Sequence, residues 1–107
     1  MKPSTRQRFV AISFNYPIAE KEIEILTKET NIDAKTAKQL VSIGNKIRNL
    51  TELGLAETVS TRLLVDAALL IHSGLPKRLS VDVAMIEPLT DENQTLQALK
   101  DLAHLMI

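Results

Sequence analysis

Residues 61–73, TRLLVDAALLIHS, restrict the possible folds of this chain more than any other segment. If they form a helix, apolar side chains surround most of its circumference: Leu63, Leu64, Val65, Ala67, Ala68, Leu69, Leu70 and Ile71. A helix that is apolar on nearly all sides must be covered by other elements. Ser60 is its expected N-cap, and Gly74 and Pro76 are its expected stop signals. The segment therefore predicts a central helix in a bundle.

The preceding segments also have helical patterns. Pro17 fits the first turn of a helix that continues to about residue 30. Asp33 is the expected N-cap of a second helix over residues 34–50, whose apolar residues recur at steps of three and four. Gly44 lies on the same face as those apolar residues, which is compatible with close packing against another helix.

Two shorter helices are expected near the C-terminus. Ser80 is predicted to cap a helix over residues 81–87, which Pro88 ends. Thr90 or Asp91 is predicted to open the last helix. Its apolar stripe is made of Leu96, Leu99, Leu102, Ala103 and Met106.

The segment before these helices has a different pattern. Residues 8–17, RFVAISFNYP, are rich in β-prone side chains and stop at a proline. A single strand cannot form a sheet alone, so it must pair with something outside this chain or with a second copy. The predicted fold class is therefore all-α: a small helical bundle preceded by one orphan β-strand.

Composition supports helices and excludes several classes of function. The 107 residues are 45% hydrophobic but only 3% aromatic, so aliphatic residues and alanine must fill the core. Thirteen basic and thirteen acidic residues cancel, which gives no electrostatic reason to expect nucleic-acid binding. There is no cysteine, and no apolar run approaches the ~20 residues that span a bilayer. Without a signal-peptide pattern at the N-terminus, we expect a cytoplasmic protein that does not bind membranes.

Few residues are candidates for chemistry. The three glycines do not form a phosphate-binding loop of the G-x-x-x-x-G-K-[ST] type. His72 and His104 lack metal-ligand spacing, and both are expected near helix C-termini. The acidic residues of the first helix are interpreted as a solvated face: Glu20, Glu22, Glu24 and Glu29.

Arg62 stands in an unusual place. A cation in the first turn of a helix is unfavourable by roughly 0.3–1 kcal/mol. The pattern alone favours an arginine that lies along the surface with its guanidinium in water. The alternative is a guanidinium that joins the helix N-terminus in facing an anion such as phosphate. Arg6 and Arg8 precede the predicted strand, and their simplest interpretation is a basic strand entry.

Three segments, KPSTRQRFVAISFNYP, STRLLVDAALLI and IEPLTDE, together resemble the C-terminal part of the MoxR-type AAA+ ATPases. The most similar group is CbbQ/NorQ/NirQ, and the resemblance covers essentially the whole chain. It implies that residues 1–16 end an α/β nucleotide-binding subdomain and that residues 17–107 form a helical lid. The Walker motifs would lie upstream, so the resemblance implies a fragment that alone needs no cofactor and is not catalytic.

The resemblance also implies roles for three arginines. Arg8 matches the arginine finger, which reaches the nucleotide of a neighbouring subunit, and Arg6 is the alternative finger. Arg62 matches the sensor-2 arginine, which contacts the γ-phosphate in its own subunit. Asp66 departs from the family pattern, in which an aromatic or apolar residue is more usual.

For the full-length parent, the resemblance implies ATP and Mg²⁺ as cofactors and a ring oligomer, expected to be a hexamer. It also implies a client metalloenzyme of the Rubisco or nitric oxide/nitrite reductase type. A different class remains open: a stand-alone helical interaction module without nucleotide chemistry. A G-x-x-x-x-G-K-[ST] motif upstream in the same reading frame would decide for the ATPase.

Overall fold

The computed structural model describes residues 16–50 and 58–107, and these residues are helical with no strand among them. Within these ranges the α-helices are α2 (Ala19–Thr30), α3 (Ala34–Arg48), α4 (Thr61–His72), α5 (Lys77–Val81) and α6 (Asn93–Leu105). A π-helical turn, η3 (Asp82–Ile86), and a 3₁₀ turn, η4 (Glu87–Leu89), follow α5 directly. The all-α prediction is confirmed. The predicted strand at residues 9–14 lies outside the described residues.

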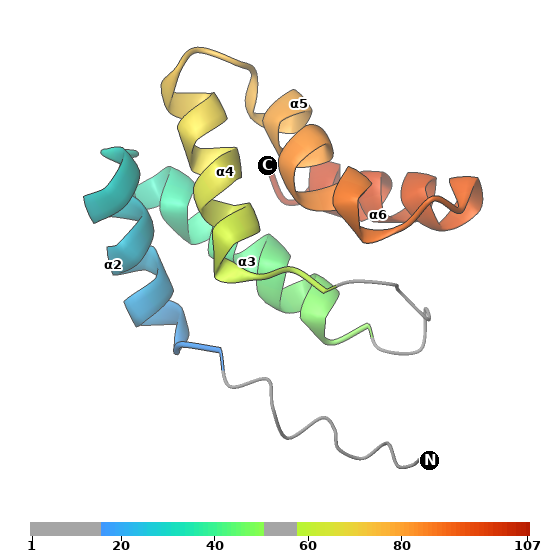
Figure 1. Cartoon of the computed structure of the whole chain (residues 1–107), viewed down its shortest axis with the longest axis horizontal. Coiled ribbons are helices and arrows are strands. Elements are labelled where there is room, and N and C mark those ends of the chain that lie inside the picture. The colour runs from blue at the N-terminus through green and yellow to red at the C-terminus, as the bar shows by residue number, and fades with distance from the viewer. Residues whose placement is uncertain (1–15, 51–57) are drawn as a thin grey trace.

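Helix α4 lies in the middle of the arrangement (Figure 1), with α2 and α3 on one side and the α5–η3 segment on the other. It packs against α2, α3, α5 and η3, as its apolar circumference predicts. Leu64, Ala67 and Ala68 are fully buried, whereas Leu69 is 46% exposed. The cover is therefore incomplete on the Leu69 side.

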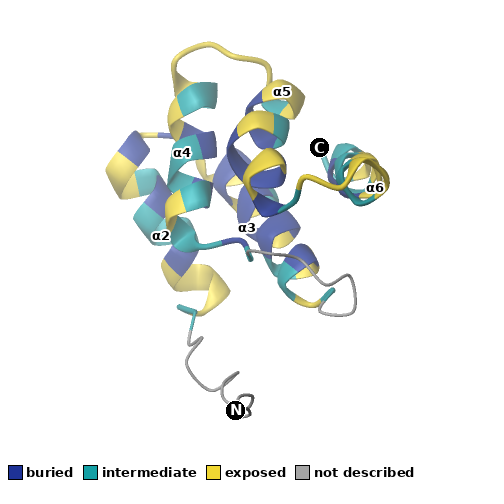
Figure 2. Ribbon diagram, turned by 45° about the vertical axis from the view of Figure 1, so that its right-hand side comes forward, coloured by how far each residue is buried: buried dark blue, intermediate teal, exposed yellow. Residues whose placement is uncertain are grey.

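The core lies between α2, α3, α4 and the α5–η3–η4 segment, whose buried faces turn toward one another (Figure 2). It is aliphatic apart from one methionine, Met85, as the shortage of aromatic residues requires. Helix α6 packs at the edge and contributes the buried Leu99 and Ala103. None of the helices in the described part of the chain is long and apolar enough to cross a membrane.

Local signals set the ends of α2 and α3. Asn31 adopts a left-handed conformation with φ 62°, and its N–H donates to the carbonyl of Thr27, which ends α2. Asp33 caps α3 as predicted: its carboxylate accepts hydrogen bonds from the N–H and the hydroxyl of Thr36, at 3.0 and 2.8 Å. Helix α3 ends at Arg48, two residues before the predicted end.

The bonds from Thr36 lower the pKa of Asp33 below its ordinary value. A depressed folded-state pKa gives stability that is present above the unfolded pKa of about 4 and is lost as the pH falls through the folded pKa. We expect Asp33→Asn to be less stable than the wild type at neutral pH. The difference should shrink below about pH 4. Urea denaturation followed by circular dichroism from pH 7 to pH 2.5 measures this, and a difference that does not depend on pH would contradict it.

The predicted starts of the last two helices were wrong. Ser80 is not an N-cap, because α5 begins at Lys77, and the Ser80 hydroxyl donates to the carbonyl of Pro76 at 2.9 Å. A serine four residues into a helix can bond backward in this way, so an N-cap residue type alone does not mark the helix start. Helix α6 is capped by Glu92, whose carboxylate accepts from the N–H groups of Thr95 and Gln94.

Candidate functional site

The N-terminus of α4 carries Arg62 as the second residue of the helix. Ser60 is the N-cap, as predicted, and its hydroxyl accepts from the N–H of Leu63 at 3.3 Å. The Arg62 side chain is exposed, and within residues 16–50 and 58–107 it has no ion pair or hydrogen bond. A guanidinium without an anion therefore stands at the positive end of a helix, and such an arrangement suits a phosphate.

A buried ion pair lies directly behind this helix end. Glu22 of α2 is 0% exposed, and Arg48, the last residue of α3, has a side chain only 7% exposed. Two nitrogen atoms of the Arg48 guanidinium each donate to a separate oxygen of Glu22, both at 2.8 Å. The interpretation of Glu22 as part of a solvated face was wrong, because the helical pattern of charges does not show which carboxylate a distant arginine will pair.

The same pair holds the chain on both sides of Ser60. The Nε of Arg48 donates to the carbonyl of Val59 at 2.7 Å. The hydroxyl of Thr61 donates to Oε2 of Glu22 at 2.8 Å. We call Glu22, Arg48, Val59 and Thr61 the α4 anchor, because their bonds fix the start of α4 to α2 and α3.

Two further contacts complete the surroundings of Arg48. The side-chain oxygen of Asn45, on the preceding turn of α3, accepts from its guanidinium at 2.9 Å. The ring of Tyr16 lies against the guanidinium, with the ring centroid 3.8 Å from Cζ, in a cation–π contact. Tyr16, which precedes α2, thereby contacts the α4 anchor.

Neither histidine lies at the start of α4. Arg6 and Arg8 lie outside the described residues. His72 is exposed at the end of α4, whereas Nε2 of His104 in the last turn of α6 lies 2.9 Å from Oδ1 of Asp82. Both histidines are at helix C-termini, as predicted. In the described ranges no group of three histidine or acidic side chains could hold a metal ion.

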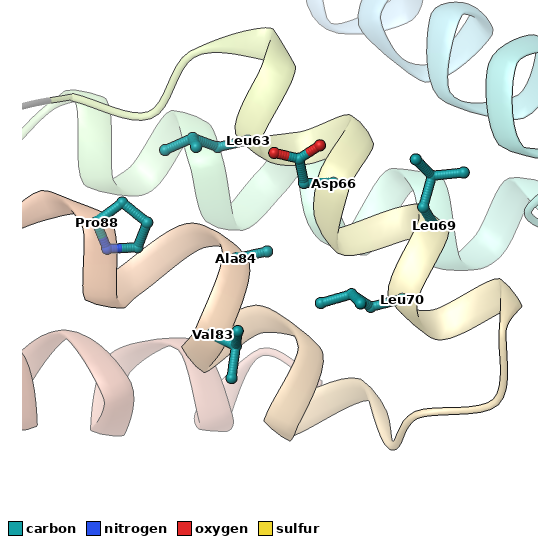
Figure 3. Close-up of a pocket in the computed structure, with 7 residues that line it drawn as sticks. All are labelled: Leu63, Asp66, Leu69, Leu70, Val83, Ala84 and Pro88. Atoms are coloured by element: carbon teal, nitrogen blue, oxygen red, sulfur yellow. The ribbon is translucent and has the colours of Figure 1, made fainter.

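An open pocket of about 390 Å³ lies between α4 and the η3–η4 segment (Figure 3). Helix α4 and the η3–η4 segment line it with Leu63, Asp66, Leu69, Leu70, Val83, Ala84 and Pro88. Asp66 is the charged residue among these otherwise apolar ones. Arg62 is not among the residues that line this pocket.

The fold and this site define a small all-α domain that presents an arginine at the N-terminus of a central helix. The family model described as CbbQ/NirQ/NorQ C-terminal matches residues 22–106. The chain belongs to this family, as the sequence resemblance predicted.

Named relatives agree with this assignment. The chain is 45% identical to the denitrification regulatory protein NirQ of Pseudomonas aeruginosa over 107 residues, which are 100% of the chain and 41% of that protein. It is 46% identical to the protein NorQ of Paracoccus denitrificans, with 96% of the chain and 38% of NorQ covered. The protein CbbQ of Hydrogenophilus thermoluteolus is 44% identical, with 96% and 39% covered. The chain thus spans about two fifths of the length of these relatives.

Proposed function

We propose that this chain is the lid region of an AAA+ ATPase and that Arg62 is its sensor-2 arginine. The observation that carries this proposal is the exposed guanidinium of Arg62, which has no anionic partner among the described residues although it stands at a helix N-terminus. Family membership and the STR sequence at residues 60–62 support the same role. In this role Arg62 binds an oxygen of the γ-phosphate, and lid movement follows the loss of that contact after hydrolysis.

In the parent protein, the two parts of this chain belong to different subdomains. Residues 1–16 end the α/β subdomain, and residues 17–107 form the lid. Bound ATP with Mg²⁺ supplies the phosphoryl group and its charge, and Arg62 helps to orient that charge from within the same subunit. Arg8, or in its place Arg6, reaches the nucleotide of the adjacent subunit, and this arrangement requires a ring, for which we propose six subunits.

The parent protein uses the energy of ATP hydrolysis to activate or remodel a partner enzyme. The name of one relative, the denitrification regulatory protein NirQ, links that protein to the regulation of denitrification, and the family resemblance of the sequence adds Rubisco as a second possibility. We therefore propose a metalloenzyme client, either a nitric oxide or nitrite reductase or Rubisco. Co-purification of the full-length protein with each candidate enzyme, with and without ATP, distinguishes these clients.

The sensor role is tested by Arg62→Ala in the full-length protein. We expect ATP turnover to fall by about 100-fold or more, the usual cost of removing a group that stabilises transition-state charge. Steady-state phosphate release measures this. Arg78→Ala is a matched control, because Arg78 is also exposed and, within the described residues, its guanidinium donates to the backbone oxygens of His104 and Ile107. Turnover that is unchanged by Arg62→Ala would remove the sensor role.

A further inference from the structure

The α4 anchor has no part in the phosphate contact proposed above. Its hydrogen bonds nevertheless hold the residues that directly precede Arg62, the residue that makes this contact. Arg48 donates to the carbonyl of Val59, and the hydroxyl of Thr61 donates to Glu22. Val59 and Thr61 lie on either side of the N-cap Ser60. Arg62 follows immediately. The position of its Cα is therefore set by side chains from two other helices, α2 and α3, in addition to its own helix.

Stability alone does not explain an ion pair in this place. A buried ion pair loses hydration, and well-packed apolar residues of similar size often serve stability equally well. An apolar pair could not bond to the carbonyl of Val59 and the hydroxyl of Thr61. The ion pair adds directional hydrogen bonds to the 59–61 segment, and these bonds fix the position of the first turn of α4.

We propose that Glu22, Arg48 and Thr61 are positioning residues for Arg62, which hold its guanidinium at the place where the γ-phosphate is bound. This inference rests on the proposed sensor role of Arg62. It adds that the precision of that role comes from a buried carboxylate on α2 and an arginine at the end of α3. Tyr16, packed on Arg48, brings the entry to the lid into contact with the same group.

The test uses Thr61→Val in the full-length protein, because valine keeps the shape of threonine and removes only the hydroxyl that bonds to Glu22. A misplacement of a catalytic group by about 1 Å can cost about 100-fold in rate, and we expect a loss of about tenfold in ATP turnover. ADP has no γ-phosphate, so its affinity should not change. Thr61→Ser restores the hydroxyl and should restore turnover.

A matched control removes a similar bond elsewhere. Thr36→Val also deletes a threonine hydroxyl that donates to a carboxylate, at the opposite end of α3 from Arg48. It should leave ATP turnover within about twofold of the wild type, because the bonds of Thr36 go to Asp33 at the start of α3 and do not involve the α4 anchor. A loss of turnover with Thr36→Val equal to that with Thr61→Val would overturn the positioning role.

The decisive measurement is a double-mutant cycle with Arg62→Ala. If Thr61 acts through Arg62, then Thr61→Val lowers turnover in the wild type and has no further effect when Arg62 is absent. An equal loss in both backgrounds, or no loss in either while Arg62→Ala is impaired, overturns the positioning role and leaves the sensor role intact. A normal Arg62→Ala enzyme overturns the sensor role and the positioning role with it.

Discussion

Arg48→Ala is expected to lower the free energy of unfolding of this chain by about 3–5 kcal/mol. The substitution leaves the carboxylate of Glu22 fully buried without its cation. It also removes the donors to the carbonyl of Val59 and to the side chain of Asn45. The cost of an unpaired buried charge exceeds the net value of the pair, which explains why a single removal is so severe. Chemical denaturation of the 107-residue chain measures the loss.

The comparison with an exposed pair on the same helix provides the control. Glu24 lies two residues after Glu22 and pairs with Lys28, and their side chains are 44% and 74% exposed. Glu24→Ala should change stability little, because an exposed pair is screened by water. Glu22→Ala combined with Arg48→Ala should cost less than the sum of the single changes. Additive losses would show that the two charges do not depend on each other, contrary to the structure.

Leu64→Ala is expected to lower the free energy of unfolding by about 2–5 kcal/mol. Leu64 is 0% exposed in the middle of the core, where α4 meets α3. Truncation removes buried apolar surface and leaves a cavity that the aliphatic neighbours cannot fill without moving. Leu69→Ala, on the same helix but 46% exposed, is the matched control and should cost far less.

Gly44 supplies the complementary substitution. A Cβ placed on it would lie 3.1 Å from Cδ2 of Leu64 and 3.4 Å from Cγ1 of Val59. The extra methyl of Gly44→Ala therefore points into the space that Leu64→Ala would empty. The double variant should be more stable than the sum of the single effects predicts, and denaturation of all four proteins gives this coupling. A sum without coupling would contradict the close packing of α3 on α4.

Much of the fold could be predicted from local sequence signals. Asp33 and Ser60 mark helix starts correctly because an N-cap bond joins residues that are close in sequence. The place of Gly44 between helices also followed, because its apolar neighbours on α3 repeat at helical steps. The same reasoning failed for Ser80, where a hydroxyl that could cap a helix bonds backward within one.

The candidate site was only partly predictable. Arg62 could be selected because its charge conflicts with the helix dipole, a conflict visible in thirteen residues of sequence. The α4 anchor could not be found in this way. Glu22 and Arg48 are separated by 26 residues, and Glu22 and Thr61 by 39. The helical period places Glu22 on the same stripe as Leu26 and Thr30, but it does not show that a cation from another helix allows this carboxylate to be buried.

The sequence by itself determined the all-α fold class and the residues at which α3 and α4 begin. It also determined the family of the chain and identified the arginine at the N-terminus of the central helix. These features depend on side chains within one or two helical turns, or on residues that match a family pattern directly. Only the tertiary structure decided which acidic residue is buried and what holds Arg62 in place. The reason is physical: the burial of Glu22 depends on Arg48 and Thr61 arriving from other helices, and that meeting exists only after the bundle has packed.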